Sequence, residues 1–323
     1  MKKIDFLAIG DIVIDAFINL KDAHVHCKTD TGSCELCIRF GDKIPYEDVI
    51  IVPAVGNSPN AAVCAARLGL KSALITTVGN DANGKDCLAV LKKEKIDTGF
   101  VNIEKGKKTN YHYVLRYGVD RTILTKHEKF SYKSIKNLPP ASFVYLSSLG
   151  SHVHNYYGQI KAYLNINKNT KLAFQPGSYQ IGLGYEKLKY FYKRAEIFVC
   201  NKEEAQKILK TKEKDINKLI KMVAHLGPKI AVVTDGPRGA FAYDGKKVYY
   251  TPMCPDPKTP VDRTGAGDAF AATFTVATIL AKNIEEALKL ACINSMSVVQ
   301  FVGAQKGLLK LNQLKQIKQH LKL

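Results

Sequence analysis

Short runs rich in β-branched and aromatic residues alternate along the chain with longer stretches of helical periodicity. The runs expected to form strands cover residues 4–10, 72–79, 142–148, 171–176, 196–201 and 229–235. The stretches expected to form helices lie near residues 58–69, 83–95, 154–167, 202–210 and 215–226. Such alternation is typical of a mostly parallel sheet with helices on both faces. The pattern predicts an α/β fold in three layers, with ligands bound beyond the carboxyl ends of the strands.

Two segments interrupt this alternation. Residues 16–50 form a long excursion after the first strand, and residues 110–126 have the pattern of two strands around the sequence YGVD. We expect both segments to form one small β-sheet that projects over the binding site as a lid, and its exposed edges favour a homodimer through the lid. The α/β core then consists of the rest of the chain, namely residues 1–15, 51–109 and 127–323. A further hairpin is expected at residues 240–250.

Charge and composition limit the classes of partner. The chain has 323 residues, and its 48 basic and 29 acidic residues give a formal net charge of +19. That excess permits binding to nucleic acid, anionic membranes or phosphorylated small molecules. The lysines are dispersed, however, and no recognition motif accompanies them, so we expect neither a nucleic-acid partner nor a membrane partner. No segment reaches the roughly 18 apolar residues of a membrane span. We expect a cytoplasmic protein whose eight cysteines are mostly thiols.

The sequence GAGD at residues 265–268 stands directly before a long apolar run. At the start of a helix the first backbone N–H groups have no partner within the helix, and the helix dipole favours an anion there. Small residues let those groups approach an anion closely. A carboxylate beside such an anion hole can accept a proton from an attacking hydroxyl, as phosphoryl transfer requires. A glycine-rich turn followed by a first-turn aspartate is the alternative interpretation.

The segment VDRTGAGDAF, residues 261–270, resembles the second signature of the ribokinase-like, or PfkB, family of carbohydrate and nucleoside kinases. Other segments resemble motifs of that family in the same order. They are GDIVID (10–15), AVGNSPNAAVCAARLG (54–69), VGNDANG (78–84), NKEE (201–204), TDGPRGA (234–240) and VVQFVGA (298–304). One departure is Val55, which stands where the first signature usually has a glycine. The resemblance implies the ribokinase-like fold and an ATP-dependent kinase that uses Mg²⁺.

The resemblance also implies roles for individual residues. Asp268 would be the general base, and Gly265, Ala266 and Gly267 would form the anion hole for the γ-phosphate. The residues implied to bind substrate hydroxyls are Asp15, Gly56 and Asn60, and those implied to border ATP are Asn201, Thr234, Gly236, Gly239 and Asn294.

Two pairs of residues are implied to bind cations. Asn201 and Glu204 would help to hold Mg²⁺ through water, and a helix cap made by the same two residues is an alternative and compatible interpretation. Asp262 and Thr264 match positions that in many relatives help to bind a monovalent cation such as K⁺ through backbone oxygens.

The substrate is less constrained by the sequence than the reaction. An unphosphorylated sugar is the first expectation, a nucleoside such as adenosine the second, and a sugar phosphate the third. Four lid side chains, those of His112, Arg116, Arg121 and Lys126, either face an anionic substrate or face solvent. A different class of function is a non-catalytic basic protein on the same fold, because a fold alone does not guarantee activity.

The lid segment contains a cluster of sulfur and imidazole groups. His26, Cys27, Cys34 and Cys37 are of the types that suit tetrahedral Zn²⁺. No second C-x-x-C completes a familiar zinc spacing, so reduced thiols on a lid strand are the alternative interpretation.

Overall fold

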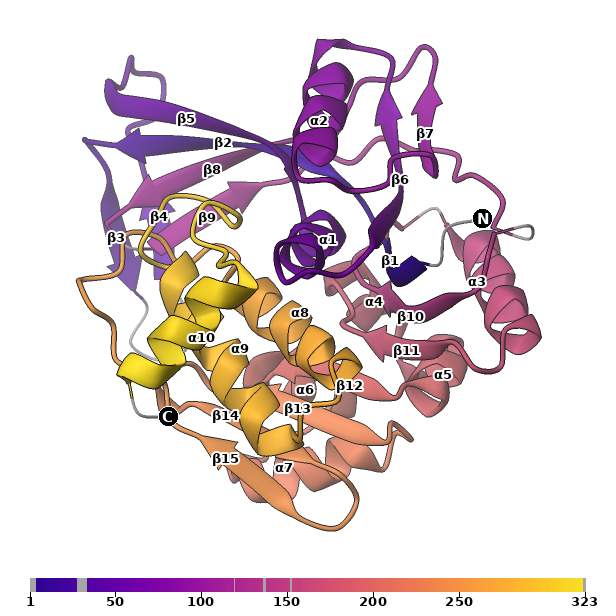
Figure 1. The fold of residues 1–323 in the computed structure, drawn as a ribbon. Coiled ribbons are helices and arrows are strands. Elements are labelled where there is room, and N and C mark those ends of the chain that lie inside the picture. The colour runs from indigo at the N-terminus through magenta and orange to yellow at the C-terminus, as the bar shows by residue number, and fades with distance from the viewer. Residues whose placement is uncertain (1–3, 28–33, 119, 136–137, 152, 322–323) are drawn as a thin grey trace.

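The computed structural model describes residues 4–27, 34–118, 120–135, 138–151 and 153–321, and its main element is a nine-stranded sheet (Figure 1). The strands follow the order β15-β14-β13-β12-β11-β10-β1-β6-β7. Their bounds are Ile4–Ile9 (β1), Ser72–Gly79 (β6), Val101–Glu104 (β7), Ala141–Leu146 (β10), Lys171–Phe174 (β11), Ile197–Asn201 (β12), Ile230–Thr234 (β13), Ala240–Tyr243 (β14) and Val248–Thr251 (β15). All neighbours are parallel except in the hairpin end, β13-β14-β15.

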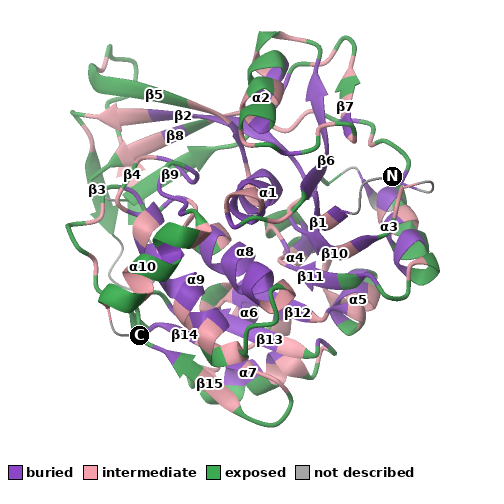
Figure 2. Ribbon diagram, in the orientation of Figure 1, coloured by how far each residue is buried: buried purple, intermediate pink, exposed green. Residues whose placement is uncertain are grey.

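Helices cover both faces of this sheet, which confirms the predicted three-layer α/β fold (Figures 1 and 2). One face carries α1 (Asn57–Arg67), α2 (Ala82–Lys93), α8 (Ala266–Ile279), α9 (Ile284–Val298) and α10 (Leu311–His320). The other carries α3 (His154–Ile166), α4 (Ser178–Leu183), α5 (Tyr185–Arg194), α6 (Lys202–Leu209) and α7 (Ile216–Ala224). Two separate hydrophobic clusters fill the spaces between the layers, because the central strands are apolar on both sides. None of the helices described is long and apolar enough to cross a membrane.

The start of α1 shows how the sheet and the helices are joined. Helix α1 begins at Asn57, and its N-cap residue Gly56 has φ of 119°. The hydroxyl of Ser58 does not cap the helix but donates to the backbone oxygen of Ile9 at the end of β1 (2.7 Å). A side chain at Gly56 would place its Cβ 2.9 Å from the backbone oxygen of Asp11. This close approach fixes the start of α1 against the carboxyl end of β1.

A second sheet of four strands projects from the core (Figure 1). Its order is β5-β2-β8-β9, with bounds Tyr46–Val55 (β5), Val13–Leu20 (β2), Tyr111–Tyr117 (β8) and Asp120–Leu124 (β9). The two strands around YGVD are therefore present. Strands β2 and β5 extend beyond the expected lid boundaries at residues 16 and 50, so Asp15 lies on a lid strand and not at the end of β1.

A small hairpin continues the lid. Strands β3 (His24–Cys27) and β4 (Cys34–Cys37) pair antiparallel, and Cys27 is joined to Cys34 by a disulfide. The predicted zinc site at His26, Cys27, Cys34 and Cys37 is contradicted, because two of its thiols are bonded to each other. Among the described residues no group of three His, Cys, Asp or Glu side chains is placed to hold a metal ion. The other six cysteines are free thiols, and five of them are buried.

Candidate active site

A cavity of about 730 Å³ lies where the lid sheet meets the carboxyl ends of the core strands. Four of its lining residues stand at or just after the ends of neighbouring strands: Ser148 after β10, Gln175 after β11, Asn201 at the end of β12 and Thr234 at the end of β13. Lid strands β2, β8 and β9 supply a second wall, and the start of α8 supplies a third. The cavity therefore collects residues from distant parts of the sequence.

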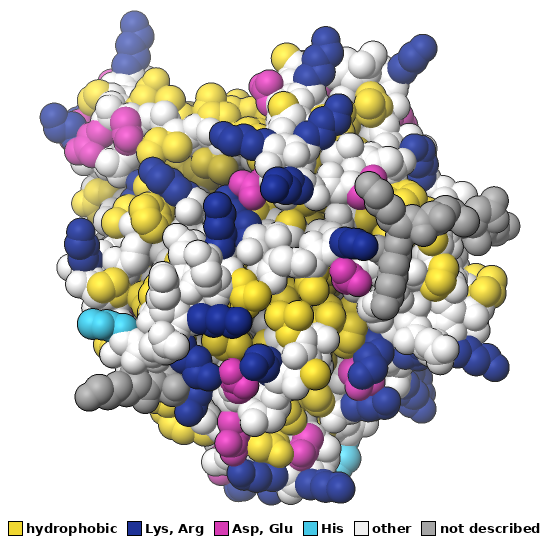
Figure 3. All heavy atoms as spheres, in the orientation of Figure 1, with side chains coloured by type: hydrophobic (Ala, Val, Ile, Leu, Met, Phe, Trp, Pro, Cys, Tyr) yellow, Lys and Arg dark blue, Asp and Glu magenta, His cyan; other side chains and the backbone are white. Residues whose placement is uncertain are grey.

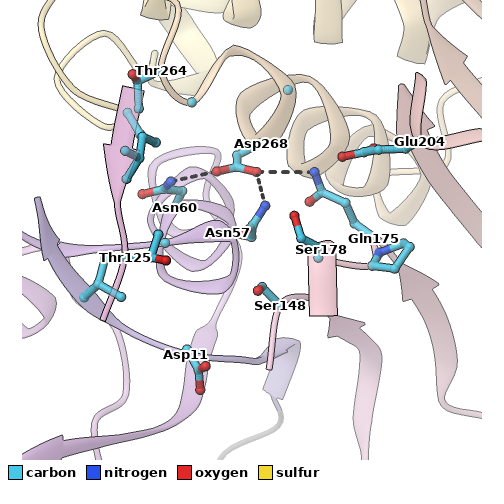
Figure 4. Close-up of a pocket in the computed structure, with 18 of the residues that line it drawn as sticks. Asp11, Asn57, Asn60, Thr125, Ser148, Gln175, Ser178, Glu204, Thr264 and Asp268 are labelled. Atoms are coloured by element: carbon cyan, nitrogen blue, oxygen red, sulfur yellow. Dashed lines mark hydrogen bonds between the residues drawn. The ribbon is translucent and has the colours of Figure 1, made fainter. Parts of the chain in front are cut away.

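Asp268 lies in the first turn of α8 and receives hydrogen bonds from three side-chain amides (Figure 4). Asn57 Nδ2 donates to Asp268 Oδ1 at 2.8 Å, Asn60 Nδ2 donates to Oδ2 at 2.8 Å, and Gln175 Nε2 approaches Oδ1 at 3.3 Å. Two of these amides are oriented in turn: Gln305 donates to Asn60 Oδ1, and the hydroxyl of Tyr145 donates to Gln175 Oε1. The carboxylate is thus held in one orientation by groups that only donate to it.

The environment of Asp268 acts on its pKa in two directions. Burial raises the pKa of this carboxyl above its ordinary value, and the nearby charge of Asp15 raises it further. The amides of Asn60, Asn57 and Gln175 oppose that shift, because they stabilise the ionised form. A carboxylate with a raised pKa is a stronger proton acceptor than an exposed one, which is the property a general base requires.

The segment before Asp268 forms the start of α8. Gly265 is its N-cap, with φ of 81°, and a Cβ there would lie 2.3 Å from the Cβ of Ala304. Gly265 and Gly267 both line the cavity, and Ala266 lies between them as the first residue of the helix. Backbone N–H groups at a helix start make a site for an anion. The three residues expected to form the anion hole therefore lie beside the carboxylate.

The expected substrate residues lie in the cavity wall, but their partners differ from expectation. Asp15, Gly56 and Asn60 all line it. The amide of Asn60 donates to Asp268 and accepts from Gln305, so one of its roles is to hold the carboxylate of Asp268. Asp15 is 8% exposed, and its Oδ1 lies 3.4 Å from Nδ1 of His112 on the neighbouring strand β8.

Asn201 and Glu204 form a reciprocal cap at the start of α6. Glu204 N donates to Asn201 Oδ1 at 2.8 Å, and Asn201 N donates to Glu204 Oε2 at 2.9 Å. The capping interpretation is therefore confirmed. Both residues also line the cavity, and burial, assisted by the charge of Asp268, raises the pKa of the Glu204 carboxyl. The carboxylates of Glu204 and Asp268 are both desolvated and face one cavity, and carboxylate oxygens are ligands that suit Mg²⁺ and its bound waters.

The loop expected to border ATP follows β13. Thr234 lines the cavity, whereas Gly236 and Gly239 belong to the turn beside it, with φ of 51° and 89°. A Cβ at Gly239 would lie 2.2 Å from the backbone oxygen of Thr251, so this glycine lets β14 meet β15. The buried Asp235 pairs with Arg238 and Lys202, and chiefly Arg238 holds its pKa below the usual range.

Asn294 does not reach the cavity. It is fully buried on α9, where its Nδ2 donates to Thr273 Oγ1 (2.8 Å) and its Oδ1 accepts from the backbone N–H of Leu309 (2.9 Å). The expected place of Asn294 beside adenine or ribose is therefore corrected, because its polar atoms are used within the core.

Asp262 and Thr264 are both buried, and the carboxylate of Asp262 is occupied by protein contacts. It accepts from the backbone N–H and the hydroxyl of Thr264 and from the backbone N–H of Gly303. The carboxylate therefore organises the loop that leads to Gly265. A monovalent cation at this loop stays a prediction that depends on backbone oxygens.

Several residues of the cavity were not predicted from the sequence. Asn57 and Gln175 hold Asp268, and Asp11, His127 and Tyr179 line the cavity. Among the lid cations, His112 and Arg121 line the cavity. Arg116 donates to Val261 O, and Lys126 pairs with Glu128. The signal that was available for Asn57 is its place inside the first signature, three residues before Asn60.

A family model described as pfkB family carbohydrate kinase matches residues 52–311, which is most of the chain. The chain belongs to the pfkB family of carbohydrate kinases. It is therefore a phosphotransferase with an alcohol group as acceptor. The resemblance of the sequence motifs to this family is confirmed.

Two curated relatives of this pfkB family kinase share about a quarter of their aligned residues with it. The bifunctional protein HldE of Aliarcobacter butzleri is 27% identical over 323 residues, which cover 94% of this chain and 62% of that protein. An uncharacterized sugar kinase of Archaeoglobus fulgidus is 26% identical, over 75% of this chain and 97% of its own. The structure of Arabidopsis thaliana ribokinase complexed with ribose and ATP is similar with a TM-score of 0.76 and 18% identity, covering 98% of this chain and 99% of that one. That likeness shows the ribokinase-like fold.

Proposed function

We propose that this pfkB family kinase transfers the γ-phosphate of ATP to a hydroxyl group of a sugar, with Asp268 as the general base. The observation that carries the proposal is the carboxylate of Asp268, held by three amide donors beside the N-terminus of α8. The similar fold of a ribokinase complexed with ribose and ATP supports the choice of substrate and nucleotide.

In the proposed reaction the acceptor hydroxyl lies beside the carboxylate of Asp268, and the γ-phosphate lies beside the backbone N–H groups at the start of α8. Asp268 takes the proton from the acceptor hydroxyl as the hydroxyl oxygen attacks the γ-phosphorus in line. The bond between the γ-phosphorus and the oxygen that bridges it to the β-phosphate breaks, and ADP is released. The N–H groups at Gly265, Ala266 and Gly267 stabilise the negative charge on the transferring group. The lid sheet covers the cavity and restricts water, which would otherwise compete as the acceptor.

Asn201 and Glu204 are the residues that would hold Mg²⁺, through its water ligands. Their fit rests on the oxygen groups that they bring to the cavity and on the raised pKa of Glu204, whose desolvated charge a divalent cation would compensate. When bound, Mg²⁺ supplies charge neutralisation for the phosphates of ATP. Thr234 would border the nucleotide from the end of β13, and Asp262 and Thr264 stay the candidates for a monovalent cation site.

The test is ADP release from Mg-ATP with a panel of pentoses, hexoses, sugar phosphates and nucleosides, with and without K⁺. We expect turnover of a sugar, and a fall in kcat of about 10²- to 10⁴-fold in Asp268→Asn, which loses the proton acceptor. The matched control is Asp42→Asn, at an exposed acid of the lid segment. A kcat in Asp268→Asn close to the wild-type value would contradict the proposal.

A further inference from the structure

One end of the cavity is built from two pairs of a carboxylate and an imidazole. Asp15 and His112 are direct partners on β2 and β8, with Oδ1 and Nδ1 at 3.4 Å. Asp11, in the loop after β1, has its Oδ2 at 3.5 Å from Nδ1 of His127. The two imidazole rings meet edge to face, with centroids 5.1 Å apart. These four residues, which we name the acid–imidazole cluster, form one continuous wall.

Part of the hydrogen-bonding capacity of this cluster is not used by the described residues. Within the described part of the chain, three buried polar atoms have no hydrogen-bond partner: Asp15 Oδ1, His112 Nε2 and His127 Nδ1. The separations of 3.4 and 3.5 Å within the two pairs are longer than a good N–H···O bond. Leaving a buried polar atom unpaired costs roughly 1–3 kcal/mol. Unpaired groups that line a cavity therefore indicate a polar ligand that pairs with them.

The chemistry of the cluster favours hydroxyl groups over phosphate. A hydroxyl donates to a carboxylate and also accepts from an imidazole, so neighbouring hydroxyls satisfy both members of a pair. Phosphate oxygens mainly accept, and the carboxylates of Asp11 and Asp15 repel them. Among the described residues no lysine lines the cavity, although the chain carries a net charge of +19. The basic surface thus does not extend to this wall.

Two arginines, Arg121 on β9 and Arg263 before α8, also line the cavity. Arg263 is two residues before Gly265, and its side chain is 57% exposed. Arg121 is exposed and is the strand partner of Arg116, whose guanidinium donates to the backbone oxygen of Val261. Arg263, two residues before the expected anion hole, is suited by its place in the chain to the phosphates of the nucleotide.

We infer that the acid–imidazole cluster selects an acceptor whose non-reacting end carries free hydroxyl groups, and that it excludes an acceptor with a phosphate at that end. The inference rests on the proposed function and narrows its substrate to an unphosphorylated sugar. Asp11, His112 and His127 are then specificity-determining residues together with Asp15. Asp11 also accepts a hydrogen bond from the hydroxyl of Tyr132, which fixes its carboxylate in place.

The experiment compares each free sugar that the enzyme accepts with the same sugar phosphorylated at its far end. We expect kcat/KM to be at least about 10-fold higher for the free sugar, since each lost hydrogen bond to a charged group is equivalent to about 10- to 100-fold in affinity. Asp11→Asn and His127→Phe should raise the KM for the sugar by a similar factor, with kcat changed by less than about 3-fold and an unchanged KM for ATP. His24→Phe, on the exposed strand β3, is the control.

Three outcomes separate the inference from the proposed function. A wild-type preference for the phosphorylated sugar, or an unchanged KM for the sugar in both folded variants, overturns the inference and leaves the kinase assignment in place. Binding of the free sugar to Asp268→Asn protein, measured by calorimetry with ATP present and weakened by adding His127→Phe, supports the inference without any turnover. Absence of ADP release with every acceptor, while sugars bind, contradicts the proposed function alone.

Discussion

At Asp268 a balance of opposing effects sets the chemistry of a single carboxylate. Burial and the charge of Asp15 raise its pKa, whereas three amide donors lower it. The amides cannot rotate freely, because Gln305 orients Asn60 and Tyr145 orients Gln175. The amides thereby favour the ionised form of the proposed base without a cationic partner, which would weaken it as a proton acceptor.

This balance predicts a pH effect of Asn57→Ala. The substitution removes one donor from Asp268 Oδ1, so the ionised form loses a hydrogen bond worth roughly 1.5–3 kcal/mol and the pKa of Asp268 rises further. The base is then protonated over a wider range of pH, and the acidic limb of the kcat profile moves to higher pH. The profile of kcat against pH checks this, with Asn167→Ala, at the end of α3, as the control. A limb that stays in place or moves to lower pH contradicts the proposed balance.

Glu204 supports a prediction about the metal requirement. Burial raises the pKa of its carboxyl, because the ionised form is poorly solvated. A cation bound nearby would therefore be attracted strongly by that charge. We expect Glu204→Gln to raise the Mg²⁺ concentration needed for half-maximal activity by about 10-fold, because Gln can form the cap without the charge. Titration of activity with Mg²⁺ at fixed ATP measures this. Glu203→Gln, at the adjacent exposed acid of α6, should behave as wild type. An equal change in the Mg²⁺ requirement of both variants would contradict a role of Glu204 in Mg²⁺ binding.

At the scale of elements, the junction between Gly265 and Ala304 places the anion hole. Gly265 has a left-handed φ of 81°, and its missing Cβ lets the loop before α8 touch the segment that follows α9. The contact joins the loop before α8 to the segment of the C-terminal motif.

Gly265→Ala should therefore disturb stability and activity together. The left-handed φ alone costs about 1–2 kcal/mol for alanine, and the contact at 2.3 Å forces the backbone to shift. We expect a lower Tm and a kcat reduced by at least about 10-fold. The control for stability is Gly267→Ala, two residues further, where a Cβ meets nothing within 4 Å and the helical backbone suits alanine. Equal Tm values for the two variants would show that the contact is not decisive.

The elements that the sequence predicted well are those that a single periodicity defines. Buried parallel strands such as β1 and β6 are short apolar runs between helices, so their pattern alone indicates them. The short strand β7 and the six-residue helix α4 were missed, because neither is long enough to show a period. The longer helices α5, α9 and α10 were not predicted either. The lid boundaries were displaced because β2 and β5 continue past the point where they leave the core.

The site was predicted as far as local motifs define it. Asp268 and its glycines are neighbours in sequence, so their chemistry is visible in one segment. The bonds from Asn57 and Gln175 to Asp268 span 211 and 93 positions, and the sequence alone does not show that residues so far apart in the chain are close in space. The error at Asn294 has the same origin, since its partners Thr273 and Leu309 come from other elements. Polar residues in apolar helices therefore do not by themselves indicate a binding site.

For the whole molecule, the distribution of charge separates two kinds of surface. Figure 3 shows Lys and Arg side chains dispersed over one face, with acidic side chains among them. The lid sheet has a different character on the face turned away from the cavity. Ile51, Ala16, Tyr113 and Leu124 are successive partners across β5, β2, β8 and β9, and they form an apolar row across the sheet. Three of these residues are 49–57% exposed: Tyr113 49%, Leu124 52% and Ile51 57%.

This apolar row is the expected contact of a homodimer. Two chains that each carry a net charge of +19 repel one another over most of their surface. The electrostatic repulsion is smallest at a neutral apolar face, so a second copy is expected to bind there. We expect the protein to sediment as a dimer at micromolar concentration. The double variant Ile51→Glu/Tyr113→Glu should sediment as a monomer, because burying carboxylates there is strongly unfavourable. Ile103→Glu, at an exposed isoleucine of β7 outside the lid, is the control.

Dimer formation should also affect the acceptor site. Ala16 and Tyr113 directly follow Asp15 and His112 on their strands, so the apolar row and the Asp15–His112 pair of the cluster occupy opposite faces of the same sheet. A partner that holds the row in place also limits movement of the cluster. The monomeric variant should therefore show a higher KM for the sugar and an unchanged KM for ATP, whose expected contacts lie on the core. A wild-type protein that sediments as a monomer would contradict the dimer, and an unchanged KM for the sugar in a monomeric variant would contradict this coupling.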